Sequence, residues 1–461
     1  MSHVAFDYLN DSVFFHEYYI REQFSKLTDA QIRTELQKYR EYILSHMEAL
    51  FEEISETQTR LSTQFPIGEG IPPSEELLKQ TALYMDRVFV SDVLFEHTQP
   101  QDDIAHSFAG FLDLPDDRID RTVLTNDVRY MKSLTSSVAA DYVKFVPLSY
   151  WHEPSGSMPL LYSPTGFSDA LDSSVLNYCH ERVKISPLKK SEDGWFISDE
   201  PLTPCGHIII GFTGHTREWT NFYHLLDQEH SEFDDETHQL KSLLTLPDTP
   251  LESDRFERWA FQSVNQAAKN VVDAINEDVR LSGLLGAMYL TQSEFAYGLL
   301  NVNPNVKQTL TTDIANLTMK LELPVLEETT LERIIDIRSN YGESFQNFRI
   351  ELEKNLRDLR TIDNPEKMRI ALENVQHELM QVQVNDMKQS LVSLRKEIPI
   401  QVFSIATGTM LTSLPFHRPN LMQLVVPAAQ SSFSMWRKIK RSQRHPGYFL
   451  WKVSKTANKI T

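Results

Sequence analysis

Apolar residues recur every three or four positions between residues 32 and 61, which is the spacing of one face of an α-helix. The segment opens with Thr28-Asp-Ala-Gln31, a capping box in which the Thr and Gln side chains satisfy backbone N–H groups. A Gly- and Pro-rich loop starts at Pro66. The pattern therefore predicts an N-terminal helical arm that ends before this proline.

A second and more regular stripe of apolar residues runs from Thr329 to Lys396. Thr329-Thr-Leu-Glu332 has the form of another capping box, and the apolar residues after it have near-heptad spacing, as in coiled coils. Asn364-Pro365 interrupts the stripe with two residues that favour the start of a new helix. The pattern predicts an antiparallel helical hairpin whose arms have about 30 residues and a length of about 45 Å.

The middle of the chain favours strands. Runs rich in β-branched and aromatic residues at 83–90 and 142–148 are candidate strands. Three further runs between Val183 and Thr213, separated by turn-forming residues, predict a small antiparallel meander. Residues 230–255 are acidic and contain two prolines, which is typical of a surface excursion, and the pattern then returns to helices up to Asn301.

These patterns predict a mainly α protein, with a small α/β or antiparallel β insertion around residues 140–245 and a long C-terminal antiparallel helical hairpin. We expect five segments along the chain. They are an N-terminal helical arm (1–66), a mixed α/β region (67–250), a helical core (251–328), the hairpin (329–397) and a tail (398–461).

The tail differs from the rest of the chain in charge. The 461 residues have a formal net charge of −19, yet no Asp or Glu follows residue 397. Its interleaved basic and aromatic residues suit nucleic acid or an anionic membrane surface. The candidate interaction residues are Arg437, Lys438, Lys440, Arg441, Arg444, Trp451 and Lys452. We favour the alternative that Tyr448 to Trp451 docks on the protein itself, since this run is too apolar to stay exposed.

Three features favour a cytoplasmic location. The chain has only two cysteines, which cannot build a disulfide framework. Its N-terminus lacks the basic and apolar regions of a signal peptide. The longest uncharged stretch, near residues 398–416, is interrupted by prolines and rich in Ser and Thr, so we expect no membrane span.

Cys205, His207 and His215 are the candidate metal ligands, because thiolate and imidazole are the usual ligands of zinc. The segment lacks the two close ligand pairs of a structural zinc site, so we expect no metal here. Phosphate-cradling and dinucleotide-binding glycine motifs are also absent from the sequence. We therefore predict that the protein uses no cofactor.

Two acids follow apolar runs that resemble strand ends. Asp92 closes the run that begins at Tyr84, and Glu294 lies in Met288-Tyr-Leu-Thr-Gln-Ser-Glu-Phe. The two segments resemble PIN-type ribonucleases, and this resemblance implies that both acids hold a divalent metal for phosphodiester hydrolysis. The chain departs from that family by having Glu at the second position and no clear middle acid.

The leading hypothesis is a non-enzymatic cytosolic regulator or subunit of a protein assembly. It acts through helical surfaces, and the hairpin is the expected site of a protein partner or of self-association. One alternative is a divalent-metal nuclease or other hydrolase that uses Asp92 and Glu294. The other is a peripheral binder of anionic membranes or nucleic acid that acts through the tail.

Overall fold

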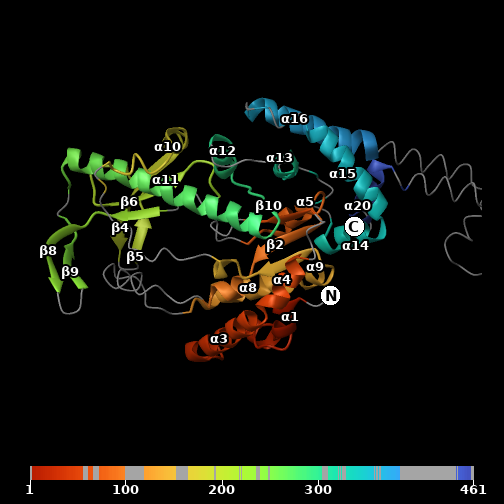
Figure 1. The fold of residues 1–461 in the computed structure, drawn as a ribbon, viewed down its shortest axis with the longest axis horizontal. Coiled ribbons are helices and arrows are strands. Elements are labelled where there is room, and N and C mark those ends of the chain that lie inside the picture. Colours follow the sequence, from red (N-terminus) through yellow and green to blue (C-terminus); the bar gives the residue numbers. More distant parts are fainter. Residues whose placement is uncertain are drawn as a thin grey trace, which may run out of the picture. The chain divides into compact units, whose positions relative to one another are not determined.

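The computed structural model, drawn in Figure 1, divides into two compact units. The first comprises Met1–Pro72 and Arg87–Thr312, and the second comprises Pro73–Asp86 and Asp313–Thr461. The structure describes residues 3–384 and 443–457 except 56–60, 66–71, 99–118, 152–162, 164, 192–193, 217–218, 220, 235–238, 248–249, 304–309, 320, 322, 324–325, 327–328, 358, 360–361, 363–364 and 444.

A four-stranded parallel sheet lies in the first unit. Its strands are ordered β10 (Met288–Tyr289), β1 (Ser62–Gln64), β2 (Arg87–Ser91) and β3 (Val143–Val146). All three neighbouring pairs are parallel. Every residue of β3 and the apolar residues of β2 are buried, as expected for parallel strands that are covered on both faces.

The fold is therefore a mixed α/β architecture, and the prediction of a mainly α protein with a small β insertion is wrong. The candidate strands at 83–90 and 142–148 overlap β2 and β3, but both pair within the parallel sheet. The other two strands of the sheet, β1 and β10, have three and two residues. Such short strands show no period-2 alternation, so the pattern of apolar residues did not indicate them.

Several helices of the first unit pack near this sheet and on one another. Helix α9 contacts β3, α3 contacts α1 and α6, and α8 contacts α2 and α6. The N-terminal helices are α1 (Val4–Leu9), α2 (Glu17–Arg21), α3 (Asp29–Ser45) and α4 (Met47–Ser55). They are followed by α6 (Val93–Glu96), α8 (Arg121–Ser133), α9 (Thr135–Ala139) and the short η1 (Leu148–Tyr150).

The start of the N-terminal arm agrees with its capping box. In α3 the Gln31 N–H donates to Thr28 Oγ1 at 3.2 Å, and the Thr28 N–H donates to Gln31 Oε1 at 2.8 Å. The stripe does not form one continuous helix, however. It is divided at His46 between α3 and α4, and its last residue, Leu61, directly precedes β1.

The predicted antiparallel strands form a second sheet of the first unit. Its strands are ordered β5 (Gly194–Ile197), β4 (Val183–Ser191), β6 (His207–Phe212) and β7 (Asn221–His224). The predicted meander order is wrong, because β4 rather than β5 lies next to β6. The acidic segment after this sheet was expected to be a surface excursion. It contains a two-stranded hairpin of β8 (Asp227–Asp234) and β9 (Gln239–Thr245).

Helix α11 (Ser253–Leu284) contacts both sheets of the first unit (Figure 1). It packs against β6 of the antiparallel sheet and against β10 of the parallel sheet. Its 32 residues span about 48 Å at 1.5 Å per residue. The same core contains residues of α10 (Ser173–His180) and α12 (Glu294–Val302).

The second unit contains the region predicted to be a hairpin. Its helices are α5 (Glu75–Thr81), α13 (Leu310–Thr318, beginning in the first unit), α14 (Leu331–Asn340), α15 (Gly342–Leu356), α16 (Pro365–His377), the π-helix η4 (Glu378–Gln383) and α20 (Pro446–Ala457). A continuous first arm is wrong, because Tyr341 leaves helical geometry between α14 and α15. The cap is Thr330 rather than Thr329, and it accepts from the Arg333 N–H.

Helix α20 packs on α14 and α15, as expected for the apolar run in the tail. Phe449 is fully buried, and its ring lies 5.2 Å from those of Phe345 and Phe348. A Cβ at Gly447 would lie 2.4 Å from the Gln383 carbonyl oxygen, so this close approach requires glycine. Within the described part of the chain, no helix is both long and apolar enough to cross a membrane.

Candidate functional site

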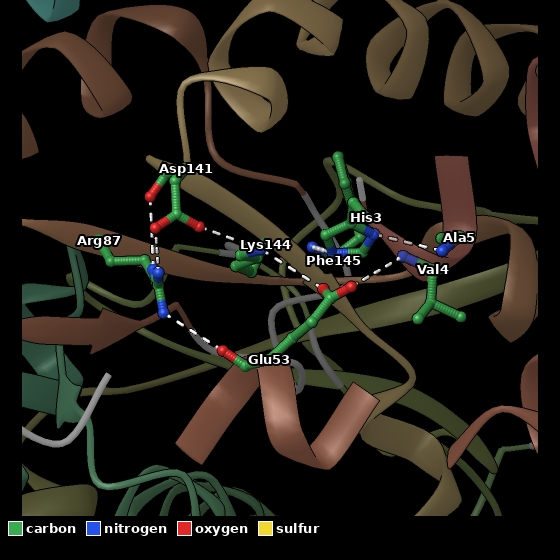
Figure 2. Close-up of polar contacts among 8 residues, drawn as sticks. All are labelled: His3, Val4, Ala5, Glu53, Arg87, Asp141, Lys144 and Phe145. Atoms are coloured by element: carbon green, nitrogen blue, oxygen red, sulfur yellow. Dashed lines mark hydrogen bonds and ion pairs between the residues drawn. The ribbon is translucent and has the colours of Figure 1, made fainter. Parts of the chain in front are cut away.

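A connected group of charged side chains lies at the amino ends of β2 and β3 (Figure 2). The Arg87 guanidinium pairs with the Asp141 carboxylate and donates through Nε to the Asp141 carbonyl at 3.3 Å. Lys144 Nζ lies 3.0 Å from Asp141 Oδ1 and 3.4 Å from Glu53 Oε2. Two cations thus meet two carboxylates that come from α4 and from the turn before β3.

The backbone of Asp141 helps to build this group. Its φ is 62°, in the left-handed region that Asp adopts more readily than most residues. In this conformation both the carboxylate and the carbonyl oxygen of Asp141 accept from Arg87. The turn therefore fixes the guanidinium at the first residue of β2.

The N-terminal segment joins the same network. The Val4 N–H donates to Glu53 Oε1 at 3.3 Å. His3 caps α1 by accepting from the Ala5 N–H at 3.2 Å, and its Nε2 faces the Phe145 N–H at 3.1 Å (Figure 2). Both ring nitrogens thus face donors, which favours the neutral form of the imidazole.

The charges of this network are compensated inside the fold. Arg87 and Lys144 are only 2% and 3% exposed. Burial raises the pKa of Glu53, whereas hydrogen bonds from Lys144 and Arg87 outweigh the burial of Asp141 and lower the pKa of that carboxyl. Ligands of parallel sheets bind outside the carboxyl ends of the strands, and this network is at the opposite ends. We therefore interpret it as structural.

Replacing His3 by Gln is expected to remove an acid-sensitive part of the stability. Burial, and to a smaller extent the charge of Lys144, lowers the pKa of His3 from 6.5 to about 3. Between about pH 3 and pH 6.5, His3 is therefore protonated in the unfolded chain but neutral in the folded protein. Stability from this group is complete above pH 6.5 and decreases as the pH falls, by about 2 kcal/mol between pH 7 and pH 5. Urea unfolding at both pH values should show a larger loss for the wild type than for His3→Gln. Equal losses would contradict a buried neutral imidazole.

Asp92 lies at the carboxyl end of β2, where a ligand site of a parallel sheet is expected. Its Oδ1 caps α6 by accepting from the Phe95 N–H at 3.1 Å, and its Oδ2 accepts from the Tyr39 hydroxyl. The side chain is fully buried, and burial raises its pKa to about 6. Both carboxylate oxygens are therefore already bonded inside the protein.

The other acid of the nuclease hypothesis has a different environment. Glu294 is the exposed first residue of α12, which Ser293 caps by accepting from the Ala296 N–H at 3.0 Å. Among the described residues, no three His, Cys, Asp or Glu side chains are grouped so as to hold a metal ion. Asp92 and Glu294 thus do not share a metal cluster of described residues.

Cys205 and His207 lie next to each other at the start of β6, while His215 packs elsewhere. The Cys205 thiol donates to the His207 carbonyl at 3.4 Å, and the His215 ring lies 5.8 Å from that of Phe295. His207 contacts His224 rather than His215, and the Nδ1 atoms of His207 and His224 lie 2.8 Å apart. One ring donates this hydrogen bond and the other accepts it.

Purified protein is expected to hold no stoichiometric zinc. The Nδ1 atoms of His207 and His224 bond to each other, and burial raises the pKa of the Cys205 thiol, which disfavours the thiolate that binds metals. Elemental analysis should give far less than one zinc per chain for both wild type and Cys205→Ala. One equivalent of zinc that disappears in Cys205→Ala would show that these residues form a metal site.

Four rings form a row on one face of the antiparallel sheet. The Trp195 ring lies 4.5 Å from that of His207 and 4.7 Å from that of His224, and the two imidazoles are 5.0 Å apart. Phe222 continues the row, with its ring 6.2 Å from that of His224. Phe222 is 61% exposed, so the row reaches the solvent.

The two faces of this sheet differ in character. Ile208, Ile210 and Phe212 point to the core that includes α11. Alternation along the paired strands places eleven residues on the other face, which we call the open face because Phe222 and Ile197 on it are exposed, although Leu188 and Ile209 are buried. They are Lys184, Ser186, Leu188, Lys190, Trp195, Ile197, His207, Ile209, Gly211, Phe222 and His224. None of the eleven is acidic, although the chain as a whole is.

Two of the predicted interaction residues in the tail lie on α20 and contact their own unit. The Trp451 ring lies 5.4 Å from that of Tyr448, and Lys452 Nζ lies 4.8 Å from the centre of the Tyr341 ring. The other five candidates lie outside the described residues. They are Arg437, Lys438, Lys440, Arg441 and Arg444.

No protein-family model, curated protein or solved structure matches this chain. The chemistry and geometry of its own residues are therefore the basis for a functional proposal.

Trp195, Phe222 and His224 were not among the candidates that the sequence supplied. Within β7, Phe222 and His224 alternate with Tyr223, which packs against the core, so a two-faced strand is visible in the sequence. The order of the strands is not visible. Only that order brings Trp195 and His207 together across the intervening strand β4.

Proposed function

We propose that this protein is a non-enzymatic binding protein, a regulator or subunit of a cytosolic assembly, and that the open face is its ligand-binding surface. The observation that supports this most strongly is the row of Trp195, His207, His224 and Phe222 on a face that reaches solvent. Exposed patches of large apolar and aromatic side chains mark interaction sites.

The state of the other candidate groups supports binding rather than catalysis. Asp92 is fully buried and caps α6, and Glu53 and Asp141 pair with Lys144. A general acid or base must come within hydrogen-bond reach of its substrate. These carboxylates instead serve the fold.

Location and further partners belong to the same proposal. Both cysteines, Cys179 and Cys205, are free thiols, which suits the reducing cytoplasm. A protein partner or self-association through α14, α15 and α16 stays a hypothesis. Binding of an anionic partner by the tail also stays a hypothesis. Two of its candidate residues, Trp451 and Lys452, have contacts inside their own unit.

Site-specific photo-cross-linking tests the proposed surface. A benzophenone amino acid replaces Phe222 in the full-length protein, expressed in its own host, and the control carries it at Ile350, which is 64% exposed on α15. We expect an adduct with a cellular macromolecule at position 222 that is lost when Trp195→Ser is added. No adduct at 222 beyond that at 350 would overturn the proposal.

A further inference from the structure

We infer that the open face binds single-stranded nucleic acid by stacking unpaired bases on Trp195 and Phe222. This inference rests on the proposed function and names the ligand of the same surface. Base stacking on aromatic side chains is the usual way in which proteins hold single strands, and an open antiparallel sheet is a known platform for it.

The spacing of the rings suits such a ligand. His207 and His224 lie opposite each other on β6 and β7, and Trp195 approaches both rings across the sheet. Phe222 extends the row by two residues along β7. The Trp195 ring thus lies against both imidazoles and Phe222 lies beyond His224, so an unpaired strand laid across the sheet meets Trp195 and Phe222 on opposite sides of the histidine pair.

The charge of the open face is complementary to a phosphate backbone. Lys184 and Lys190 lie on this face together with the rings, and none of its residues is acidic, in a chain with a net charge of −19. Acids flank the face in the sequence: Glu192 and Asp193 come between β4 and β5, and Asp199 and Glu200 follow β5, where Glu200 pairs with Lys189. A face with two lysines and no acid favours an anionic ligand over a cationic one at this position.

The histidine pair adds hydrogen-bonding capacity to the platform. Burial lowers the pKa of His207, and burial followed by the charge of His207 lowers that of His224 to about 4, so both rings are neutral near pH 7. Because their Nδ1 atoms bond to each other, the Nε2 atoms are the ring nitrogens that remain for a ligand. Each Nε2 atom can form one hydrogen bond, as donor or acceptor, with the edge of a base.

An unpaired strand fits these features better than a duplex or a protein segment. A duplex keeps its bases stacked on one another, so the rings of the open face offer it no stacking partner. The buried centre of a protein interface is depleted in charged residues, whereas here Lys190 flanks the rings on β4 and is itself exposed. A folded protein partner and a second copy of this chain are the competing occupants.

Fluorescence anisotropy with labelled oligonucleotides tests the inference on the full-length protein. The probes are a single-stranded oligo(dT), a single-stranded oligo(U) and a mixed-sequence DNA duplex. We expect a single strand to bind more tightly than the duplex, with an affinity that falls as salt increases. Phe222→Ser and Trp195→Ser should each weaken binding by about fivefold or more, the lower limit for loss of one stacking contact.

Ile350→Ser and Leu284→Ser are the matched controls, since both remove an exposed apolar side chain, 64% and 63% exposed, outside the open face. Both should bind like the wild type, and thermal melting should show all four variants folded. No binding of either single strand, equal binding of the duplex, or binding unchanged in both ring variants would overturn the inference. If the benzophenone at position 222 cross-links only to another protein or to a second copy of this chain, the open face is still a binding surface, but nucleic acid is not its ligand.

Discussion

Replacing Leu352 by Asp is expected to lower the free energy of unfolding of the second unit by more than about 4 kcal/mol. Leu352 is fully buried on α15, in the unit where α20 packs on that helix. The substitution removes a large apolar side chain and places a carboxylate at a position from which water is excluded. Urea unfolding, followed by far-ultraviolet circular dichroism, should show the transition at much lower urea.

Ile350→Asp is the matched control for this prediction. It introduces the same charge two residues away on the same helix, where the side chain is 64% exposed. Its free energy of unfolding should stay within about 0.5 kcal/mol of the wild type, as for most surface substitutions. Similar losses in both variants would mean that the two faces of α15 are assigned incorrectly.

Lys144→Met is expected to destabilise the first unit by about 3 to 5 kcal/mol, because removing one member of a buried ion pair leaves the other as an uncompensated buried charge. Lys144 is 3% exposed and bridges Glu53 and Asp141, so its loss leaves Arg87 as the only cation of the network in Figure 2. Methionine keeps most of the apolar stem, so packing changes little. Chemical unfolding of the full-length protein measures the loss.

A second substitution separates charge from packing in this network. Glu53→Gln removes one of the two carboxylates that Lys144 neutralises. The double variant Lys144→Met, Glu53→Gln should therefore be more stable than the sum of the two single losses predicts, as for residues that share one network. Additive losses, or a Lys144→Met variant as stable as the wild type, would show that the ion pairs contribute little.

Local signals in the sequence were sufficient for several elements. The capping box at Thr28 begins α3, and the turn-separated runs between Val183 and Thr213 form three strands of the antiparallel sheet. The apolar run from Tyr448 is buried in α20. In each case the signal lies within a few residues of the structure that it determines.

Elements that depend on distant partners were not predictable in the same way. Thr63 of β1 donates through its hydroxyl to the carbonyl of Met288 in β10, 225 residues away. A strand of two or three residues has no period of its own, so its existence depends on such a partner. The mistaken cap is a different case, because Thr329 and Thr330 are adjacent and only the helix geometry selects Thr330.

The candidate sites show the same division. The sequence singled out Asp92 and placed it at a strand end, which is where it lies. Its burial and its bond from Tyr39, 53 residues away in sequence, are tertiary properties. The open face is also tertiary, since four strands must assume the order β5-β4-β6-β7 before Trp195 meets His207.

Mapping the contact between the protein and a single strand tests the central claim most directly. A 4-thiouridine-containing oligo(U) is cross-linked to the full-length protein with ultraviolet light, and mass spectrometry identifies the modified peptides. We predict adducts on peptides that contain Trp195 or Phe222, in β5 and β7 of the open face. Adducts confined to other peptides, such as those from residues 437–452 of the tail, would contradict the assignment of the open face as the binding surface.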